Sequence, residues 1–331
     1  MDIIQVSHLR KEYRLGNRII PAIKDISFTV RQGEVFGFLG PNGAGKSSTI
    51  NILCTVLKPT SGTVILDSQN VMDSPHQVRK SIGVVFQDPS LDEKLTAWEN
   101  LDFHARLYNV PANLKLERIN MLLKLTGLGE RRHDLVSSFS GGMKRRLEIA
   151  RGLIHYPKVL FLDEPTIGLD PQSRTHIWGY VEMLRKTENL TIFLSTHYME
   201  EAENCDRIAI IDHGEIITLD TPANLKKEAA ADRIQIRTDQ PGQAKSFIEE
   251  HFGLKVEEDE DGMMSFEMEN AEQFLPEFVR SFPFSLTSLN IRRPTLDDVF
   301  LKLTGHGIRP EGADRKSLMR ARVRIKGRTR N

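Results

Sequence analysis

Short apolar runs separated by turn residues dominate the first ninety residues, a pattern typical of β-strands. Some of the runs alternate apolar and polar positions, as half-buried strands do, whereas others are continuously apolar. The predicted strands are Ile3–Leu9, Ala22–Val30, Val35–Leu39, Val64–Leu66 and Ile82–Phe86. A Gly-rich loop and a helix over Ser47–Leu57 follow the third of these strands.

From Leu91 to Arg151 the pattern becomes helical and amphipathic, with Pro111 and Gly127 as breakers. Strands resume beyond it, with a helix over Ser173–Thr187 between the first two. These later strands are predicted at Val159–Leu162, Thr191–Ser195 and Arg207–Ile211. Strands that alternate with helices predict an α/β core with a parallel sheet, here interrupted by a helical insertion.

A domain boundary is expected near Asp220–Pro222, followed by a helical stretch to Ala231. The remaining pattern has the order β-α-β-β-α-β, which predicts a small α+β domain of ferredoxin-like arrangement. Its predicted elements are Arg233–Thr238, Gln243–Phe252, Leu254–Glu258, Met263–Met268, Ala271–Ser281 and Ser285–Arg292. A last helix is expected over Thr295–Thr304, with Thr295 as its cap and Gly305 as its stop.

Composition narrows the class of protein. The 331 residues carry 45 basic and 45 acidic side chains, and this balance argues against a nucleic-acid binder. Cys54 and Cys205 are too few for a disulfide framework and favour a reducing compartment. No apolar run approaches the roughly 18 residues of a membrane span, and the N-terminus does not resemble a signal peptide. We therefore expect a cytoplasmic protein whose membrane role, if any, depends on a partner.

The zero net charge conceals segregation along the chain. Residues 228–272 hold thirteen acidic and four basic residues, whereas residues 311–331 hold eight basic and two acidic ones. The tail is expected to be a solvated, flexible terminus. An alternative is that it contacts anionic lipid headgroups, to which each basic residue would contribute about 1 kcal/mol.

The Gly-rich loop that follows Val35–Leu39 matches G-x-x-x-x-G-K-[ST] and opens a helix, which is the context that this phosphate-binding motif requires. Its glycines allow backbone N–H groups to surround phosphates, and the helix N-terminus adds partial positive charge. The expected phosphate-binding residues are Gly40, Pro41, Asn42, Gly43, Ala44, Gly45, Lys46, Ser47 and Ser48. Lys46 would neutralise the β- and γ-phosphates, and the Ser47 hydroxyl would bind Mg²⁺.

Two adjacent carboxylates, Asp163 and Glu164, follow the apolar strand Val159–Leu162. A carboxylate at the end of a buried strand can hold the Mg²⁺ hydration shell, the role expected of Asp163. Glu164 can orient the attacking water or accept its proton, and is the expected base.

With these motifs the chain resembles the ATP-binding cassette (ABC) ATPases. Ser140–Leu147 is similar to the family's signature motif, although Met143 stands where many members carry Gln. Gln87 resembles the Q-loop glutamine, Gly168–Asp170 the D-loop, and His197 the switch histidine. The resemblance covers Ile3 to about Leu219 with the motifs in family order. It implies a P-loop NTPase cassette with a parallel-sheet core, an antiparallel β subdomain and a helical subdomain.

The resemblance also implies roles for individual residues. Gln87 would contact the metal or the water, His197 the γ-phosphate, and Tyr13 the adenine. Ser140, Gly141, Gly142 and Asp170 would contact ATP held by a second subunit, so that two cassettes enclose two ATP molecules and the chain must dimerise or pair with another cassette. The implied metal ligands are Ser47, Gln87 and Asp163.

The segment Arg293–Leu301, followed by Leu303–Gly305, resembles the region appended to daunorubicin-resistance-type exporter ATPases. It implies the ATPase subunit of an ABC-2-type exporter of drug-like or lipid-like compounds, bound to a separate permease at the cytoplasmic face of the membrane. The alternative is a non-transport ABC ATPase that acts on ribosomes or nucleic acid, although such proteins have a second cassette or a long coiled coil. The expected domains are residues 1–220 (ATPase), 221–305 (accessory α+β) and 306–331 (basic tail).

Overall fold

The computed structural model describes residues 1–229, 231–259 and 262–305, and the predicted basic tail lies outside these residues. The described chain divides into two compact units, one from Met1 to Thr221 and the other beginning at Pro222. Each unit has its own sheets and is described separately.

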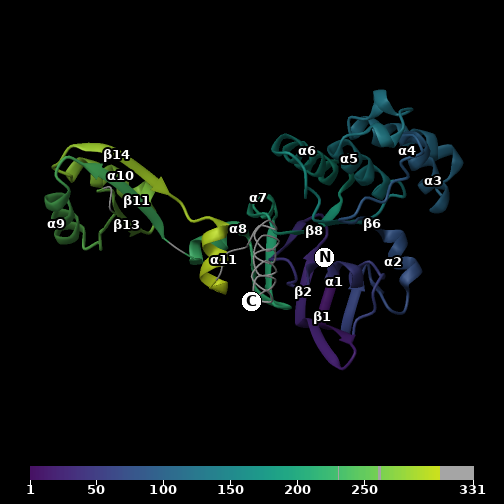
Figure 1. Ribbon diagram of the computed structural model, residues 1–331, viewed down its shortest axis with the longest axis horizontal. Helices are drawn as coiled ribbons and strands as arrows, with labels where there is room; N and C mark the ends of the chain where they lie inside the picture. Colours follow the sequence, from purple (N-terminus) through teal and green to yellow (C-terminus); the bar gives the residue numbers. More distant parts are fainter. Residues whose placement is uncertain (230, 260–261, 306–331) are drawn as a thin grey trace, which may run out of the picture. The chain divides into compact units, whose positions relative to one another are not determined.

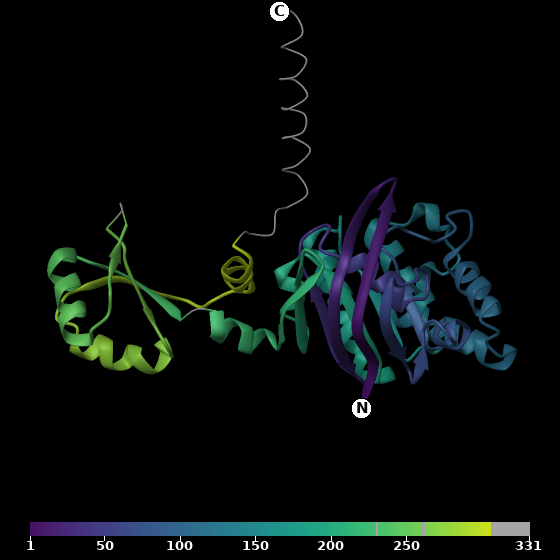
Figure 2. The ribbon, with the colours of Figure 1, turned by 90° about the horizontal axis from the view of Figure 1, so that it is seen from below.

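The first unit contains a four-stranded antiparallel sheet in the order β2-β1-β4-β5. Its strands are β1 (Asp2–Leu15), β2 (Arg18–Arg31), β4 (Ser61–Leu66) and β5 (Gln69–Asn70). Figure 2 shows β1 and β2 as a long hairpin, with pairing that extends to Leu15 and Arg18. The sequence pattern predicted only the buried halves of these strands, because the outer halves are exposed and lose the alternation.

A six-stranded sheet in the order β10-β9-β3-β8-β7-β6 forms the centre of the same unit. Five of its strands are parallel, and β10 pairs antiparallel to β9. The strands are β3 (Val35–Leu39), β6 (Ile82–Val85), β7 (Val159–Asp163), β8 (Thr191–Thr196), β9 (Arg207–Asp212) and β10 (Glu215–Asp220). In this register Asp163 lies opposite Ser195, so the carboxyl ends of β7 and β8 meet at one edge of the sheet.

Helices connect the strands, and those of the predicted insertion pack on one another (Figure 1). Pro111 precedes the second helix of the insertion and Gly127, with a φ of 67°, follows its end, as the breaker pattern predicted. The helices of this unit are α1 (Lys46–Leu53), α2 (Pro75–Ser81), α3 (Ala97–Leu107), α4 (Ala112–Leu125), α5 (Gly141–Gly152), α6 (Pro171–Glu188) and α7 (Met199–Ala202). Short 3₁₀ turns cover Gly129–Arg131 and Val136–Ser138.

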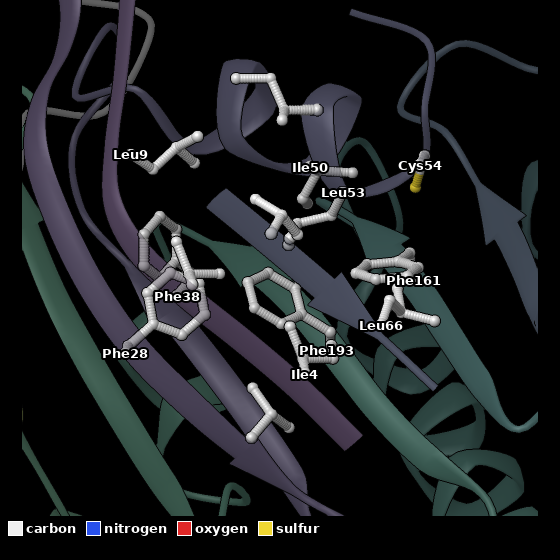
Figure 3. Packing of buried hydrophobic residues seen from close by; sticks show 14 of the residues in the cluster. Ile4, Leu9, Phe28, Phe38, Ile50, Leu53, Cys54, Leu66, Phe161 and Phe193 are labelled. Atoms are coloured by element: carbon white, nitrogen blue, oxygen red, sulfur yellow. The ribbon is translucent and has the colours of Figure 1, made fainter. Parts of the chain in front are cut away.

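The main core of this unit lies between the two sheets and α1 (Figure 3). Four phenylalanine rings from β2, β3 and β7 surround Phe193 on β8, with centroids 5.4 to 6.1 Å from its own. Such aromatic pairs each contribute about 0.5–1.5 kcal/mol beyond the burial of their area. The core therefore holds the strands whose ends carry the predicted site, and Cys54 is one of its small buried members.

The second unit contains a four-stranded antiparallel sheet in the order β12-β13-β11-β14. Its elements are α8 (Pro222–Ala229), β11 (Asp232–Thr238), α9 (Pro241–Phe252), β12 (Glu257–Glu258), β13 (Met264–Met268), α10 (Ala271–Ser281), β14 (Leu286–Arg292) and α11 (Leu296–Thr304). Both α9 and α10 pack on one face of the sheet, around Ile234, Ile236 and Phe278 (Figure 2). This β-α-β-β-α-β order with neighbouring central strands is the ferredoxin-like arrangement, so the predicted fold class is confirmed.

Local chemistry explains the ends of α11. Thr295 and Asp298 form a reciprocal capping box at its start, and Gly305 ends it with a φ of 76°. The predicted strand Leu254–Glu258 is reduced to Glu257–Glu258, which pairs with β13, whereas Leu254 and Val256 pack against the core of this unit without joining the strand.

Candidate functional site

The loop between β3 and α1 forms the predicted phosphate-binding motif. Gly43 and Gly45 have φ values of 85° and 107°, in the region that side-chain-bearing residues rarely adopt. A Cβ at Gly45 would lie 2.6 Å from the carbonyl oxygen of Ala22, so only glycine fits there. No side chain caps α1, whose first backbone N–H groups therefore remain donors for an anion.

Lys46 is buried at the start of α1, with 4% of its side chain exposed. Its Nζ donates to the carbonyl oxygens of Gly40 (2.7 Å) and Pro41 (3.1 Å), and lies 3.3 Å from Oε1 of Glu164. Burial lowers the pKa of Lys46, and the nearby carboxylates of Glu164 and Asp163 oppose that shift without cancelling it. The loop thus holds a cation out of solvent, surrounded by oxygen acceptors.

Asp163 ends β7 and faces two hydroxyl groups. Ser47 Oγ lies 3.4 Å from its Oδ1, and Ser195 on β8 donates to the same oxygen. Burial raises the pKa of the Asp163 carboxyl, against the lowering effect of these two donors. A charge on this carboxyl is costly unless a cation or further donors reach it.

Glu164 follows in a left-handed backbone conformation, with a φ of 46°. Its N–H donates to the carbonyl oxygen (3.1 Å) and hydroxyl (3.2 Å) of Ser195. Its carboxylate lies between two groups, 3.3 Å from Lys46 Nζ and 3.3 Å from Nδ1 of His197. Burial alone would raise the pKa of Glu164, but His197 and Lys46 together outweigh it and hold the pKa below its usual value.

These groups border a hollow of about 430 Å³. It is lined by six of the nine predicted phosphate-loop residues and by Gln87 and Glu164, together with Ala22. The lining residues are Ala22, Asn42, Gly43, Gly45, Lys46, Ser47, Ser48, Gln87 and Glu164. Asp163 and His197 do not line the hollow, but each contacts a residue that does: Asp163 contacts Ser47, and His197 contacts Glu164. Tyr13, 40% exposed, places its hydroxyl 3.1 Å from Ser48 Oγ.

The residues of the signature segment and the D-loop lie together but do not line this hollow. Ser140 caps α5 and accepts a hydrogen bond from the N–H of Met143 (3.3 Å), while Asp170 caps α6 and accepts one from the N–H of Ser173 (2.9 Å). A Cβ at Gly142 would lie 2.9 Å from Ser173 Oγ, so the two helix N-termini are in close contact. One copy of the chain therefore has two separate groups of predicted nucleotide contacts.

Sequence reasoning missed two side chains that shape the site. The sequence pattern places Ser195 only at the end of an apolar strand, although a hydroxyl within such a strand is a signal of a buried hydrogen bond. Arg145 belongs to the segment that resembles the signature motif, yet its side chain donates to the backbone of Asp163, Glu164 and Pro165. Its only sequence signal is the spacing to Glu148, one helical turn away.

Within the described ranges, no helix combines the length and the apolar character that crossing a bilayer requires.

Residues 23–167 match the sequence profile of the ABC transporter family. The chain is 38% identical over 311 residues to the daunorubicin/doxorubicin resistance ATP-binding protein DrrA of Streptomyces peucetius, covering 92% of each chain. It is 36% identical to the linearmycin resistance ATP-binding protein LnrL of Bacillus subtilis, over 93% of this chain and 100% of that one. Among solved structures, the dimeric ATP-binding cassette MJ0796 bound to ADP and Pi superimposes with a TM-score of 0.61 at 28% identity, covering 66% of this chain and 98% of the other.

Fold and site together define a P-loop ATPase of the cassette type. The chain belongs to the ABC transporter family, as an ATP-binding subunit of the daunorubicin-resistance type. It is a nucleotide-binding ATPase subunit of an exporter, and the solved cassette to which it is similar is a dimer. Subunits of this kind work with separate membrane permease subunits.

Proposed function

We propose that ATP is hydrolysed at the hollow bordered by Lys46 and Glu164. The loop Gly40–Ser48 holds the phosphates, Tyr13 stacks on the adenine, and Glu164 accepts the proton of the attacking water. His197 orients the γ-phosphate and the carboxylate of Glu164. The observation that carries this proposal is the buried carboxylate of Glu164, which lies 3.3 Å from both Lys46 and His197.

Mg²⁺ is proposed to bind between the nucleotide and the ends of β6 and β7. Ser47, Gln87 and Asp163 supply a hydroxyl, an amide and a carboxylate, all through oxygen, which is the donor type that this cation requires. The burial that raises the pKa of Asp163 makes a cation at that carboxyl favourable. When bound, the ion neutralises charge on the phosphates; the protein residues hold its position and that of the water.

A second copy of the chain is proposed to complete each site. Ser140, Gly141 and Gly142, at the exposed start of α5, contact the γ-phosphate held by the partner, and Asp170 at the start of α6 supports that contact. The dimeric relative bound to ADP and Pi supports this arrangement. The division into an ATPase domain (1–220), an accessory domain (221–305) and a basic tail (306–331) is part of the same proposal.

The transported compound is proposed to be a drug-like or lipid-like molecule that a separate permease exports. The names of the relatives support this class: daunorubicin/doxorubicin resistance, linearmycin resistance, and Nod factor export in a protein of Ralstonia nicotianae that is 37% identical over 313 residues. The subunit would then act at the cytoplasmic face of the membrane. The basic tail lies outside the described residues, and its contact with anionic lipid stays an alternative.

The hydrolytic proposal is tested by Glu164→Gln. Loss of the base should lower kcat by about 10²–10⁴-fold while ATP binding remains and the dimer accumulates on size-exclusion chromatography. The matched control is Glu34→Gln, which changes another buried carboxylate, paired with Arg207 at 2.7 Å, at the opposite end of β3. Turnover at the parental rate in Glu164→Gln would show that Glu164 is not the base.

The export proposal needs a test in the producing cell. Disruption of the gene should raise the accumulation of at least one compound in a broad panel of amphiphilic drugs and lipids, and Glu34→Gln, but not Glu164→Gln, should restore export. Unchanged accumulation across the panel would contradict export and would favour the non-transport alternative.

A further inference from the structure

The guanidinium group of Arg145 is buried on α5, with 8% of its side chain exposed. Its Nε donates to the carbonyl oxygen of Pro165 (2.7 Å), and its Nη2 donates to those of Asp163 (3.0 Å) and Glu164 (3.3 Å). Its Nη1 donates to the carbonyl oxygen of Phe86 (2.6 Å) and to Glu148 (3.0 Å). A guanidinium has five N–H donors in a fixed plane, and here each has an acceptor.

The backbone atoms that Arg145 binds belong to the hydrolytic centre. Residues 163–165 carry the proposed metal carboxylate and the base, and Glu164 has its left-handed backbone in the middle of that run. Phe86 directly precedes Gln87, which lines the hollow. Arg145 therefore joins the backbone at the base to the backbone at Gln87 through one planar group.

Other side chains of α5 hold the far end of the Gln87 loop. Glu148, 1% exposed, accepts a hydrogen bond from the N–H of Ser90 (2.8 Å). Arg151 donates to the carbonyl oxygen and to the hydroxyl of Ser90, each at 2.6 Å. The loop is thus attached to α5 at Phe86 and at Ser90, on both sides of Gln87.

The same helix begins at the signature segment. Ser140 caps α5, and Arg145 lies five residues further along, about 7–8 Å along the axis at 1.5 Å per residue. A helix moves as a rigid element over such a length, so a displacement at Ser140–Gly142 reaches the guanidinium undiminished.

We propose that Arg145 is a positioning residue that links the signature segment to the hydrolytic centre of its own chain. This inference rests on the proposed function, in which Ser140–Gly142 contact the nucleotide held by the partner. Contact with that nucleotide fixes the start of α5, and Arg145 then fixes the backbone of Glu164 and of the Gln87 loop. Each chain's hydrolytic centre thereby responds to the nucleotide in the other site.

The test is a double-mutant cycle on the full-length protein, with Arg145→Lys and Ser140→Ala. A lysine keeps the charge opposite Glu148, but its compact ammonium cannot serve five acceptors in one plane. Because misplacement of catalytic groups by about 1 Å costs on the order of 10²-fold, we expect kcat to fall about 10–100-fold in Arg145→Lys. The affinity for ATP should stay within about threefold, since Arg145 contacts no residue of the phosphate loop.

The cycle distinguishes linkage from two independent effects. If Arg145 transmits the signature contact, the double variant should have the kcat of Arg145→Lys, because the lost signal has no further effect. The matched control is Arg118→Lys, another buried arginine, which donates to the carbonyl oxygen of Leu153 at 2.8 Å, just beyond the other end of α5. Any small effect of Arg118→Lys on kcat should multiply with the effect of Ser140→Ala, as expected for two residues that act separately.

Two results would overturn the inference. Effects of Arg145→Lys and Ser140→Ala that multiply within about twofold would mean that the two residues act separately. A parental kcat in Ser140→Ala would show that the signature contact has no effect on hydrolysis, and it would also contradict the proposed contact across the dimer. The result for Glu164→Gln does not depend on this contact and would stand independently. If Arg145→Lys does not fold, the pair Arg145→Gln with Glu148→Gln removes both buried charges together and takes its place in the cycle.

Discussion

Three glycines of the phosphate loop allow backbone strain and steric contact to be measured separately. A Cβ at Gly40 would lie 2.2 Å from the carbonyl oxygen of Ile211, although the backbone of Gly40 is not in the left-handed region. At Gly43 the φ is 85° and nothing lies within 4 Å of the added carbon. At Gly45 both conditions hold, with a φ of 107° and 2.6 Å to the oxygen of Ala22.

The expected losses of stability follow from these two causes. Gly43→Ala should cost about 1–2 kcal/mol, the price of a left-handed backbone at a residue with a Cβ. Gly40→Ala should cost about 1–3 kcal/mol, because the strand end at Ile211 must shift to admit the methyl group. Gly45→Ala should combine both effects, at about 2–5 kcal/mol, if strain and contact add.

Urea unfolding followed by tryptophan fluorescence is the suitable assay, since both tryptophans, Trp98 and Trp178, lie in the first unit. Binding of a fluorescent ATP analogue to each folded variant provides a second measurement. Gly40→Ala should weaken that binding, because the carbonyl of Gly40 holds Lys46 at 2.7 Å. A Gly40→Ala protein as stable as the parent, or a Gly45→Ala protein more stable than Gly43→Ala, would refute this reasoning.

Three further predictions concern the core, the pH dependence and a helix cap. Phe193→Ala should lower the free energy of unfolding by about 3–5 kcal/mol, whereas the same change at Phe103, 58% exposed, should cost much less; equal midpoints in urea would contradict the packing argument. Burial, with the charges of Arg151 and His155, lowers the pKa of His104 from 6.5 to about 4. The stability that the neutral imidazole contributes is therefore present above pH 6.5 and is lost as the pH falls towards about 4. In His104→Gln, the free energy of unfolding should fall less steeply over that pH range than it does in the parent protein. An unchanged dependence on pH would contradict this role of His104. Thr295→Ala should destabilise α11 by about 1 kcal/mol, measured by amide exchange. Gln240→Ala is the control, because the side chain of Gln240 makes no hydrogen bond at the start of α9. Equal changes in amide exchange in the two variants would contradict a stabilising role of the capping box.

Elements with a strong local signal were predictable from the sequence. The strand Val35–Leu39 is a continuous apolar run, and α10 over Ala271–Ser281 has a clear amphipathic period; the structure has both with the predicted bounds. Helix α2 was missed because Pro75–Ser81 is almost entirely polar and buries only Val78. Strand β10, over Glu215–Asp220, was missed because it lies at the sheet edge and is only partly buried.

The candidate site was predictable to the extent that strand ends determine it. Side chains that follow parallel strands meet at one edge of the sheet, so the positions of Asp163 and His197 follow from the strand pattern alone. The left-handed backbone of Glu164, its hydrogen bonds to Ser195 and the five donations by Arg145 depend on contacts between segments far apart in the sequence. No periodicity within one segment records such contacts.

The pairing of Lys46 with Glu164 explains why a single substitution should separate binding from hydrolysis. The ammonium group of Lys46 is surrounded by two carbonyl oxygens and one carboxylate, which together compensate a buried cation. An arriving phosphate would compete with Glu164 for this cation and place negative charge near the carboxylate, and both effects raise the pKa of Glu164 from its lowered value. Nucleotide binding would thus convert a carboxylate held by its cation into a better proton acceptor. Glutamine at this position cannot accept the proton, yet it no longer competes for Lys46, so ATP binding should persist or strengthen while turnover is lost.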